Sequence, residues 1–180
     1  RMQDKVVLIT GAAAGIGLGV ARRLAAEGAS LWLADVQAQA CEAAADAIAR
    51  EFGVPVGCGA ADVSERAQVL AMVDAAHSRF GRVDVLVNNA WGLRPGHTRG
   101  FKGVENLSPE DSDWGWQIGA QGPLWAMQAV FEGMKSRGWG RIINMCSLNG
   151  VNAHPYSLDY NMAKEALRTL TRTAAREWAA

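Results

Sequence analysis

A tyrosine and a lysine lie four residues apart in the segment Tyr160-Asn161-Met162-Ala163-Lys164. If this segment is helical, the spacing places the phenol and the ammonium on one face, one turn apart. A free tyrosine holds its proton too tightly to exchange it efficiently at neutral pH. A neighbouring ammonium favours the phenolate, which would make Tyr160 a usable general acid or base. An isolated pair of this kind is more often an exposed lysine whose stem passes an aromatic ring.

A serine precedes this pair and adds a second candidate catalytic group. Ser147 follows an apolar run and lies 13 residues before Tyr160. Its hydroxyl could donate a hydrogen bond to a carbonyl oxygen, and a serine that merely begins a loop is the alternative interpretation. No G-x-S-x-G segment surrounds Ser147, so the pattern does not indicate a hydrolase nucleophile.

Near the beginning of the chain, glycines stand between an apolar run and a helical pattern, in Thr10-Gly11-Ala12-Ala13-Ala14-Gly15-Ile16-Gly17. Glycine permits a sharp turn and lets a bulky anion approach the backbone. The free N–H groups and the positive dipole end of the following helix suit a diphosphate. The spacing alone is weak, and a turn chosen for packing is the alternative. The strand before it and the helix after it favour cofactor binding.

Polar residues also end the next predicted strands. Asp35 lies 18 residues beyond Gly17, where a carboxylate can accept hydrogen bonds from the ribose hydroxyls of an adenine dinucleotide. It would repel a 2′-phosphate, and neither 11–17 nor 34–40 contains an Arg or Lys to offset that repulsion. The sequence therefore favours NAD over NADP. The later strands end in two further polar segments, each of which alone is more often a turn than a ligand contact: Asp62-Val63 and Asn88-Asn89-Ala90.

Strands that alternate with helices must position these residues, and the pattern predicts such an alternation. Apolar runs indicate strands at 5–11, 31–34, 54–61, 83–87 and 140–146. Helices are predicted at 15–28, after Asp35 to about 52, at 64–80 with Ser64 as N-cap, at about 112–137 and from about 157 onward. Residues 90–110 break the rhythm and predict a long functional or mobile loop. The alternation predicts an α/β fold, a doubly wound parallel sheet in one domain over 1–180.

Composition excludes several other classes of protein. The 180 residues are 49% apolar and 20% charged, with a formal net charge of zero, which argues against a disordered chain and against a basic nucleic-acid binder. No apolar run reaches the roughly 18 residues that a membrane span needs. The three cysteines are odd in number and lack metal-ligand spacing, so we expect reduced thiols in a cytoplasmic protein and no metal site.

As an ordered set, these motifs resemble the short-chain dehydrogenase/reductase family, in its typical NAD(P)-binding Rossmann-fold group. The matching pieces are Thr10-Gly11-x-x-x-Gly15-Ile16-Gly17, Asp35, Asp62-Val63, Asn88-Asn89-Ala90, Ser147 and Tyr160-x-x-x-Lys164. The resemblance implies an oxidoreductase that transfers a hydride between NAD and a secondary alcohol or ketone. Tyr160 would then move the proton, Ser147 would position the substrate oxygen, and Lys164 would tune Tyr160 and hold the nicotinamide ribose.

The same resemblance implies which residues contact the cofactor. They are Gly11, Ala14, Gly15, Ile16, Gly17, Asp35, Asp62, Val63, Asn89, Ala90, Tyr160 and Lys164. Members of the family commonly form dimers and tetramers through the helices matching 112–137 and 157–180, so the resemblance implies a homodimer or homotetramer. The last predicted helix carries an apolar stripe that would face either a second subunit or the chain's own sheet: Leu167, Leu170, Ala174 and Trp178. The expected partner is a small-molecule substrate, with neither nucleic acid nor membrane.

Three features depart from the family pattern. Gly119 stands where the family usually has an Asn that helps to hold a proton-relay water. Trp91 stands where the Asn-Asn-Ala-Gly motif has Gly, so its ring must swing away from the cofactor or crowd it. The sequence stops at Ala180, before the sixth and seventh strands of the family, and we expect it to be part of a longer product. These departures motivate an alternative function, an NAD-binding sensor or scaffold without turnover.

Tryptophans gather around the irregular segment and the helix that follows it. They are Trp91, Trp114, Trp116 and Trp125. Some of them could line a pocket for a bulky apolar substrate, but packing in the core or at a subunit contact is the expected role.

Overall fold

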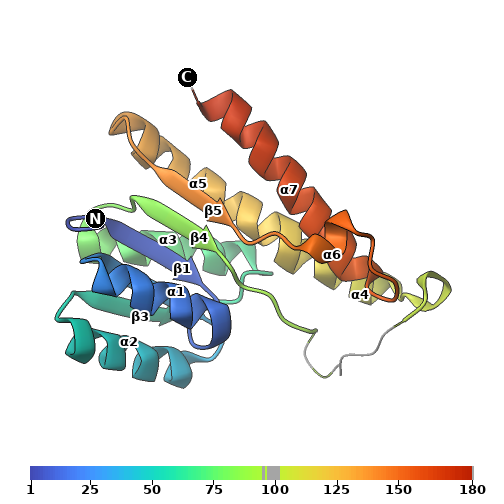
Figure 1. The fold of residues 1–180 in the computed structure, drawn as a ribbon, viewed down its shortest axis with the longest axis horizontal. Helices are drawn as coiled ribbons and strands as arrows, with labels where there is room; N and C mark the ends of the chain where they lie inside the picture. The colour runs from blue at the N-terminus through green and yellow to red at the C-terminus, as the bar shows by residue number, and fades with distance from the viewer. Residues whose placement is uncertain (95, 97–101, 180) are drawn as a thin grey trace.

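A computed structural model describes residues 1–94, 96 and 102–179 of the chain. Five parallel strands form one sheet in the order β3-β2-β1-β4-β5, with helices on both of its faces (Figure 1). The strands are β1 Val6–Thr10, β2 Ser30–Asp35, β3 Val56–Ala60, β4 Val85–Asn88 and β5 Arg141–Asn144. This confirms the predicted α/β class and the doubly wound parallel sheet.

The helices follow the predicted alternation with one change. They are α1 Gly15–Ala26, α2 Ala38–Phe52, α3 Arg66–Phe80, α4 Pro109–Trp116, α5 Gly122–Ser136, α6 Leu148–Val151 and α7 Leu158–Trp178, with a 3₁₀ turn η1 at Val104–Asn106. The helix predicted at about 112–137 is confirmed in its extent, since α4, a π-helical turn η2 at Gln117–Gln121, and α5 follow one another without a break over 109–136. The pattern did not predict that Gln117–Gln121 forms a π-helical turn. The pattern did not predict η1 or α6. Within the described residues, no helix combines the length and apolarity that crossing a bilayer requires.

Side chains of the central strands alternate between two cores, one on each face of the sheet. Val7 and Ile9 face α1 and α2, whereas Leu8, between them in sequence, faces α3 and α5. α7 packs beside α5, where the rings of Phe131 and Trp178 stack with centroids 4.2 Å apart (Figure 1). Leu170, Ala174 and Trp178 pack against the same core as α3 and α5, and Leu167 is buried. The predicted apolar stripe of α7 therefore faces the chain itself.

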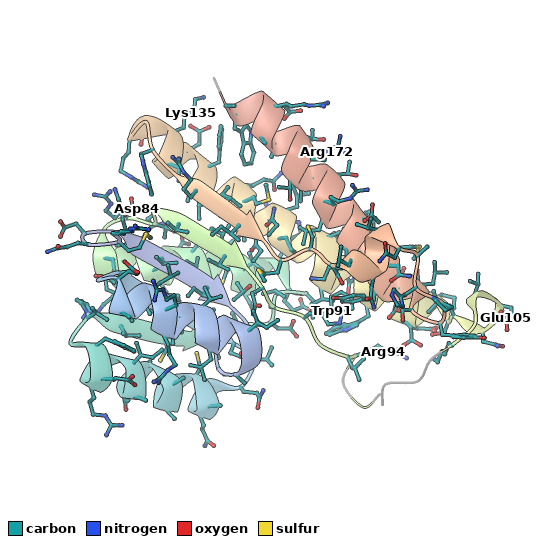
Figure 2. The ribbon with its side chains drawn as sticks, in the orientation of Figure 1. Asp84, Trp91, Arg94, Glu105, Lys135 and Arg172 are labelled. Carbon is teal, nitrogen blue, oxygen red and sulfur yellow. The ribbon has the colours of Figure 1, made fainter. Side chains whose placement is uncertain are left out.

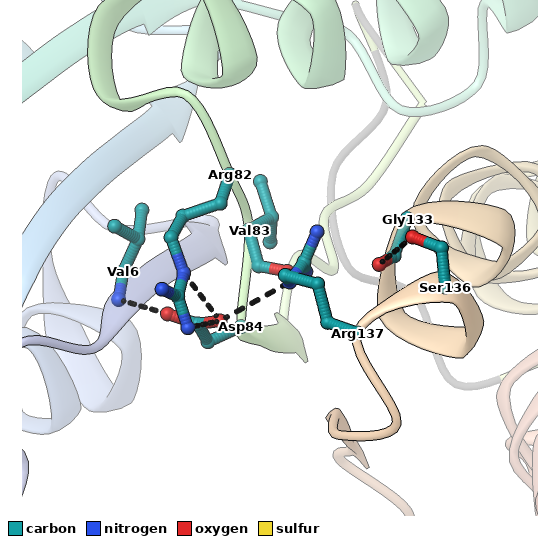
Figure 3. Close-up of polar contacts among 7 residues, drawn as sticks. All are labelled: Val6, Arg82, Val83, Asp84, Gly133, Ser136 and Arg137. Atoms are coloured by element: carbon teal, nitrogen blue, oxygen red, sulfur yellow. Dashed lines mark hydrogen bonds and ion pairs between the residues drawn. The ribbon is translucent and has the colours of Figure 1, made fainter.

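A buried carboxylate closes the amino-terminal end of the sheet. Asp84, just before β4, is 0% exposed. Its Oδ2 accepts a hydrogen bond from the Val6 N–H at 2.9 Å, and its Oδ1 accepts one from Arg82 Nε at 2.8 Å (Figure 3). Arg137, after α5, adds a guanidinium nitrogen 3.8 Å from Oδ1 and donates to the Val83 carbonyl at 2.6 Å. A charge taken out of water needs such partners, so this cluster ties together β1, β4 and the end of α5.

Cys41, Cys58 and Cys146 are free thiols, as predicted. Cys41 lies on the inner side of α2, and burial raises its pKa to about 12, with the neighbouring Cys58 as the next cause. At neutral pH the Cys41 thiol therefore stays protonated and packs as a small apolar side chain.

Candidate active site

The parallel register brings the predicted strand-end residues to one rim of the sheet. Thr10 at the end of β1 aligns with Ala34 of β2, and Asn88 at the end of β4 aligns with Asn144 of β5. The carboxyl ends of four strands therefore meet at this edge, which we call the carboxyl rim. Loops that follow parallel strands at such an edge build the ligand sites of α/β folds.

The glycines between β1 and α1 are required by close backbone contacts. A methyl group at Gly11, whose φ is +64°, would lie 2.8 Å from Cα of Ala90. A methyl group at Gly17 would overlap the Gly11 carbonyl oxygen and lie 2.6 Å from Nδ2 of Asn89. Gly15, with φ +56°, has nothing within 4 Å of its Cβ position. One side of the loop is therefore packed against the end of β4, and the other side is open.

Thr10 and the segment after β4 fix this loop. Nδ2 of Asn89 donates to the carbonyl oxygens of Thr10 at 2.9 Å and Gly11 at 3.0 Å. The Thr10 hydroxyl accepts the N–H groups of Asn89 at 3.0 Å and Ala90 at 3.1 Å. Asn89 and Ala90 thus shape the seat of the loop, and their direct contact with a cofactor stays a prediction.

The open side of the loop fits a dinucleotide. α1 begins after Ala14, which provides no side-chain cap, so the first N–H groups of the helix point to the rim with a positive dipole end behind them. Ile16 is exposed beside them. The Asp35 carboxylate accepts hydrogen bonds from the N–H groups of Ala13 at 3.0 Å and Gln37 at 3.1 Å. A helix N-terminus that could hold a diphosphate and a carboxylate that could accept a ribose hydroxyl therefore lie on adjacent strand ends, and their contact with a cofactor stays a prediction.

The segment after β3 differs in detail from the prediction. Ser64 is not the N-cap of α3, because that helix begins at Arg66 after Glu65, which makes no side-chain cap. Ser64 instead donates its hydroxyl and its N–H to Oδ1 of Asp62, at 2.7 and 2.9 Å, since a short carboxylate readily closes a turn with the residue two positions on. Val63 is buried in the core, and its contact with a ligand at the rim stays a prediction.

Lys164 is buried and anchored at the carboxyl rim. The residue is 4% exposed, and its Nζ donates to the Met145 carbonyl, just after β5, at 2.7 Å. The same Nζ lies 5.6 Å from the centroid of the Tyr160 ring, which confirms that both groups share one face of α7. Burial lowers the pKa of Lys164, and the nearby Cys146 opposes this shift. The predicted alternative of an exposed lysine is wrong.

Ser147 precedes a short helix, α6, that packs against α7, the helix that carries this pair. It is the N-cap of α6, and its Oγ accepts the Asn149 N–H at 3.2 Å. α6 contacts α7 so closely that a methyl group at Gly150 would lie 3.2 Å from the carbonyl oxygen of Asn161, the neighbour of Tyr160. The Ser147 hydroxyl accepts this one bond, which leaves its proton available for a substrate oxygen.

Trp91 and Gly119, the two departures from the family pattern, meet in the structure. The Trp91 ring stands edge-on to Tyr160, with centroids 4.8 Å apart and an interplanar angle of 78°. A methyl group at Gly119 would lie 2.7 Å from Cζ3 of Trp91 and 2.6 Å from Cβ of Ala163. The Trp91 ring therefore occupies the space that a side chain at position 119 would need. Trp91, Trp114 and Trp125 pack against the core, as expected, whereas Trp116 is exposed.

Two features of the rim were not found from the sequence. Nδ2 of Asn88 donates to Oδ1 of Asn144, and Nδ2 of Asn144 donates to Oγ1 of Thr171, both at 2.8 Å. This chain of bonds links β4, β5 and α7. The π-helical turn η2 carries Gly119 and contacts α7. In the sequence, Asn144 could have been recognised as a single polar residue at the end of an apolar run.

Comparisons with known proteins match nearly the whole chain. A family profile described as short chain dehydrogenase covers residues 5–180. Levodione reductase of Leifsonia aquatica is 36% identical over 183 residues, which include 99% of this chain and 65% of the relative. The chain thus spans just under two thirds of that relative's length.

Solved structures agree with the fold described above. NAD⁺-bound xylitol dehydrogenase superposes with a TM-score of 0.90 at 35% identity, covering 99% of this chain and 66% of that one. L-sorbose reductase from Gluconobacter frateurii, complexed with NADPH and L-sorbose, gives a TM-score of 0.91 at 32% identity, covering 98% and 65%. With the glycine loop, the rim carboxylate and the Ser147, Tyr160 and Lys164 side chains in place, the chain belongs to the short-chain dehydrogenase family.

Proposed function

We propose that the protein is an NAD-dependent oxidoreductase that transfers a hydride between the nicotinamide and a secondary alcohol or ketone. The observation that carries this proposal is the buried Lys164, anchored to the Met145 carbonyl and facing the Tyr160 ring at the carboxyl rim. A buried ammonium with so few partners is costly, and it is kept where its charge favours a neighbouring phenolate. The relatives are named for reductases and dehydrogenases of alcohols and ketones, which supports the same class.

In the direction of alcohol oxidation, three side chains divide the work. Ser147 keeps its own proton and donates a hydrogen bond to the substrate oxygen, which orients the carbinol carbon. Tyr160 accepts the substrate hydroxyl proton as the C=O bond forms, and Lys164 stabilises the phenolate that takes it. A bound NAD supplies the acceptor for the hydride that leaves carbon. Ketone reduction uses the same groups in reverse, with Tyr160 as the acid.

We further propose that the cofactor is NAD in preference to NADP. The compared structures include both an NAD⁺ and an NADPH complex, so the preference rests on this chain's own residues. Asp35 already uses its carboxylate to hold the Ala13 and Gln37 N–H groups, which keeps a negative charge at the ribose end of the seat. A 2′-phosphate placed there would meet that charge.

Steady-state absorbance of NADH with a panel of secondary alcohols and ketones tests the proposed activity. Turnover is expected in the wild type, and Tyr160→Phe is expected to lose about 10²–10⁴-fold in kcat because the proton-transfer group is gone while the ring remains. Tyr156→Phe, an exposed tyrosine on the segment before α7, serves as the matched control. Equal rates for the wild type and Tyr160→Phe would reject the catalytic role of Tyr160.

The alternative function, an NAD sensor or scaffold, predicts a different result for the same protein samples. It requires tight NAD binding in calorimetry together with no turnover of any substrate.

Homodimer or homotetramer formation also stays a proposal. The α7 stripe that suggested a subunit contact packs inside the chain, so light scattering of the protein decides the oligomeric state without support from that stripe.

A further inference from the structure

We propose that Trp91 is a positioning residue for the Tyr160–Lys164 pair, its indole filling the space beside Gly119 and bracing both side chains. The inference rests on the proposed function of that pair. Trp91 follows β4, and its neighbour Ala90 is fixed by the Thr10 hydroxyl. The indole therefore projects from a rigid base rather than from a free loop.

Contacts surround the indole on three sides. Tyr160 meets it in a T-shaped arrangement with a centroid separation of 4.8 Å. Lys164 Nζ lies over the indole, 5.4 Å from the ring centroid. On a third side, Cζ3 stands 2.7 Å from where a methyl group of Gly119 would be. Removing the ring would leave Tyr160 and Lys164 each without one wall.

These contacts constrain both groups in a way that suits the reaction. An edge-to-face aromatic pair limits the rotation of the Tyr160 ring about its axis and its tilt. The indole face attracts the ammonium, which opposes the effect of burial and helps Lys164 to stay charged. A phenol held at one angle keeps its oxygen aligned with the reacting atoms, and a small misplacement there lowers the rate strongly.

Gly119 is the complementary half of this device. It lies in the buried π-helical turn, and any side chain there would meet the indole on one side and Cβ of Ala163 on the other. Ala163 directly precedes Lys164 on α7. A side chain at position 119 would therefore displace both the Trp91 ring and this part of α7. The absence of a side chain at position 119 is therefore the condition that lets Trp91 reach the pair.

The first test reports on the Tyr160 ring and needs no turnover. In protein labelled with 3-fluorotyrosine, the ¹⁹F resonance of Tyr160 is identified by its absence from Tyr160→Phe, and a Tyr156→Phe background removes the resonance of the other tyrosine in this sequence. Trp91→Gly is expected to move this resonance toward that of free fluorotyrosine and to narrow it, whereas Trp91→Phe retains most of its offset and width. Trp139→Phe is the matched control, since Trp139 also lies under a lysine, with Lys5 Nζ 4.0 Å from its ring centroid, but at the other end of the sheet.

The second test separates positioning from cofactor binding. Trp91→Gly is expected to lower kcat about tenfold to 100-fold, the range for a slightly misplaced catalytic group, with the KM for NAD changed about twofold or less. Trp91→Phe recovers most of the loss because it restores a ring edge against Tyr160. Gly119→Ala lowers the unfolding midpoint, and it lowers it less in the Trp91→Gly background, because the two residues share one space.

The outcomes distinguish the two proposals. An unchanged ¹⁹F resonance and an unchanged kcat in Trp91→Gly, with an active wild type, overturn the positioning role and leave the proposed oxidoreductase intact. A wild type without turnover on any substrate overturns the proposed function. In that case the ¹⁹F resonance and the unfolding midpoints still decide whether Trp91 braces Tyr160. Additive effects of Trp91→Gly and Gly119→Ala would also count against the shared space.

Discussion

The two ends of the parallel sheet hold buried charges for different purposes. At the amino-terminal end, Asp84 has a backbone N–H and two guanidinium groups as partners, so its charge is matched within the protein (Figure 3). At the carboxyl rim, Lys164 has a carbonyl oxygen and two aromatic faces, with no carboxylate bonded to it in the described residues. Figure 2 shows Asp84 and Trp91 at opposite ends of the strands.

The buried charge at one end of the strands therefore contributes to stability, and the one at the other end is available for the proposed catalysis. A matched buried charge fixes geometry but has little left to offer a ligand. An unmatched buried charge costs stability and keeps its field for a reacting group. The comparison therefore predicts that substitutions at the first end change unfolding while leaving the site intact, and that substitutions at the second end do the reverse.

The largest effect on stability is expected from Asp84→Ala. Removing the carboxylate leaves Arg82, Arg137 and the Val6 N–H without it, and breaking a buried pair in this way costs about 3–5 kcal/mol. Urea unfolding measures the loss, with Asp74→Ala on the exposed side of α3 as the control. The NAD dissociation constant of the folded variant should stay at the wild-type value, and a weaker affinity would show that the two ends are coupled.

Ser147→Ala is expected to show the opposite profile. Loss of the hydroxyl that orients the substrate oxygen lowers kcat by about 100-fold or more. Loss of an N-cap on the four-residue helix α6 costs about 1 kcal/mol or less of unfolding free energy. Ser136→Ala at the end of α5, whose hydroxyl donates to the Gly133 carbonyl, is the matched control and leaves kcat unchanged (Figure 3). A stability loss without a kcat loss would place Ser147 in a purely structural role.

The sequence predicted the carboxyl rim better than the other end, and the reason is geometric. In a parallel sheet, residues that end apolar runs meet at one edge whatever the loops do, so Gly11, Asp35 and Asn88 could be placed together from their order alone. Asp84 sits at the beginning of an apolar run and looks like an ordinary strand boundary. Its importance depends on Arg82 and Arg137 meeting it in space, which periodicity does not encode.

The same limit explains what was missed at the site. Trp91 and Gly119 were each recognised as departures, but only the packing of the segment after β4 against α7 and η2 shows that one accommodates the other. The π-helical turn could not be predicted, because a single π turn within a longer helical stretch has no sequence pattern of its own. The Ser64 N-cap failed for a local reason, since Asp62 competes for the same hydroxyl.

Asp35→Ser tests the proposed preference for NAD over NADP at the carboxyl rim. Serine can still accept the Ala13 N–H but carries no charge, so the ratio of kcat/KM for NADP to that for NAD should rise about tenfold or more, as expected for removal of one close like charge. Parallel assays with both cofactors measure the ratio. Asp46→Asn, on the exposed face of α2, controls for net charge and leaves the ratio unchanged. No change in Asp35→Ser would mean that the 2′-position lies away from β2.

The smallest effect is expected from Lys164→Met, which tests whether the Lys164 ammonium lacks a counter-charge in the folded protein. Burial lowers its pKa below the ordinary 10.5, so between the folded and unfolded values the unfolded chain holds more protons and wild-type stability rises with pH. Lys164→Met lacks this group, and the stability of the wild type relative to it should therefore increase as pH rises toward 10.5, by about 1.4 kcal/mol for each unit of pKa depression. Urea unfolding from pH 7 to 10.5 measures this, with both proteins in a Cys146→Ala background because the pKa of that thiol is itself raised by burial and it lies near the lysine. A difference that is flat with pH would mean that Lys164 is solvated or matched in solution, and the contrast between the two ends of the sheet would then fail at its second end.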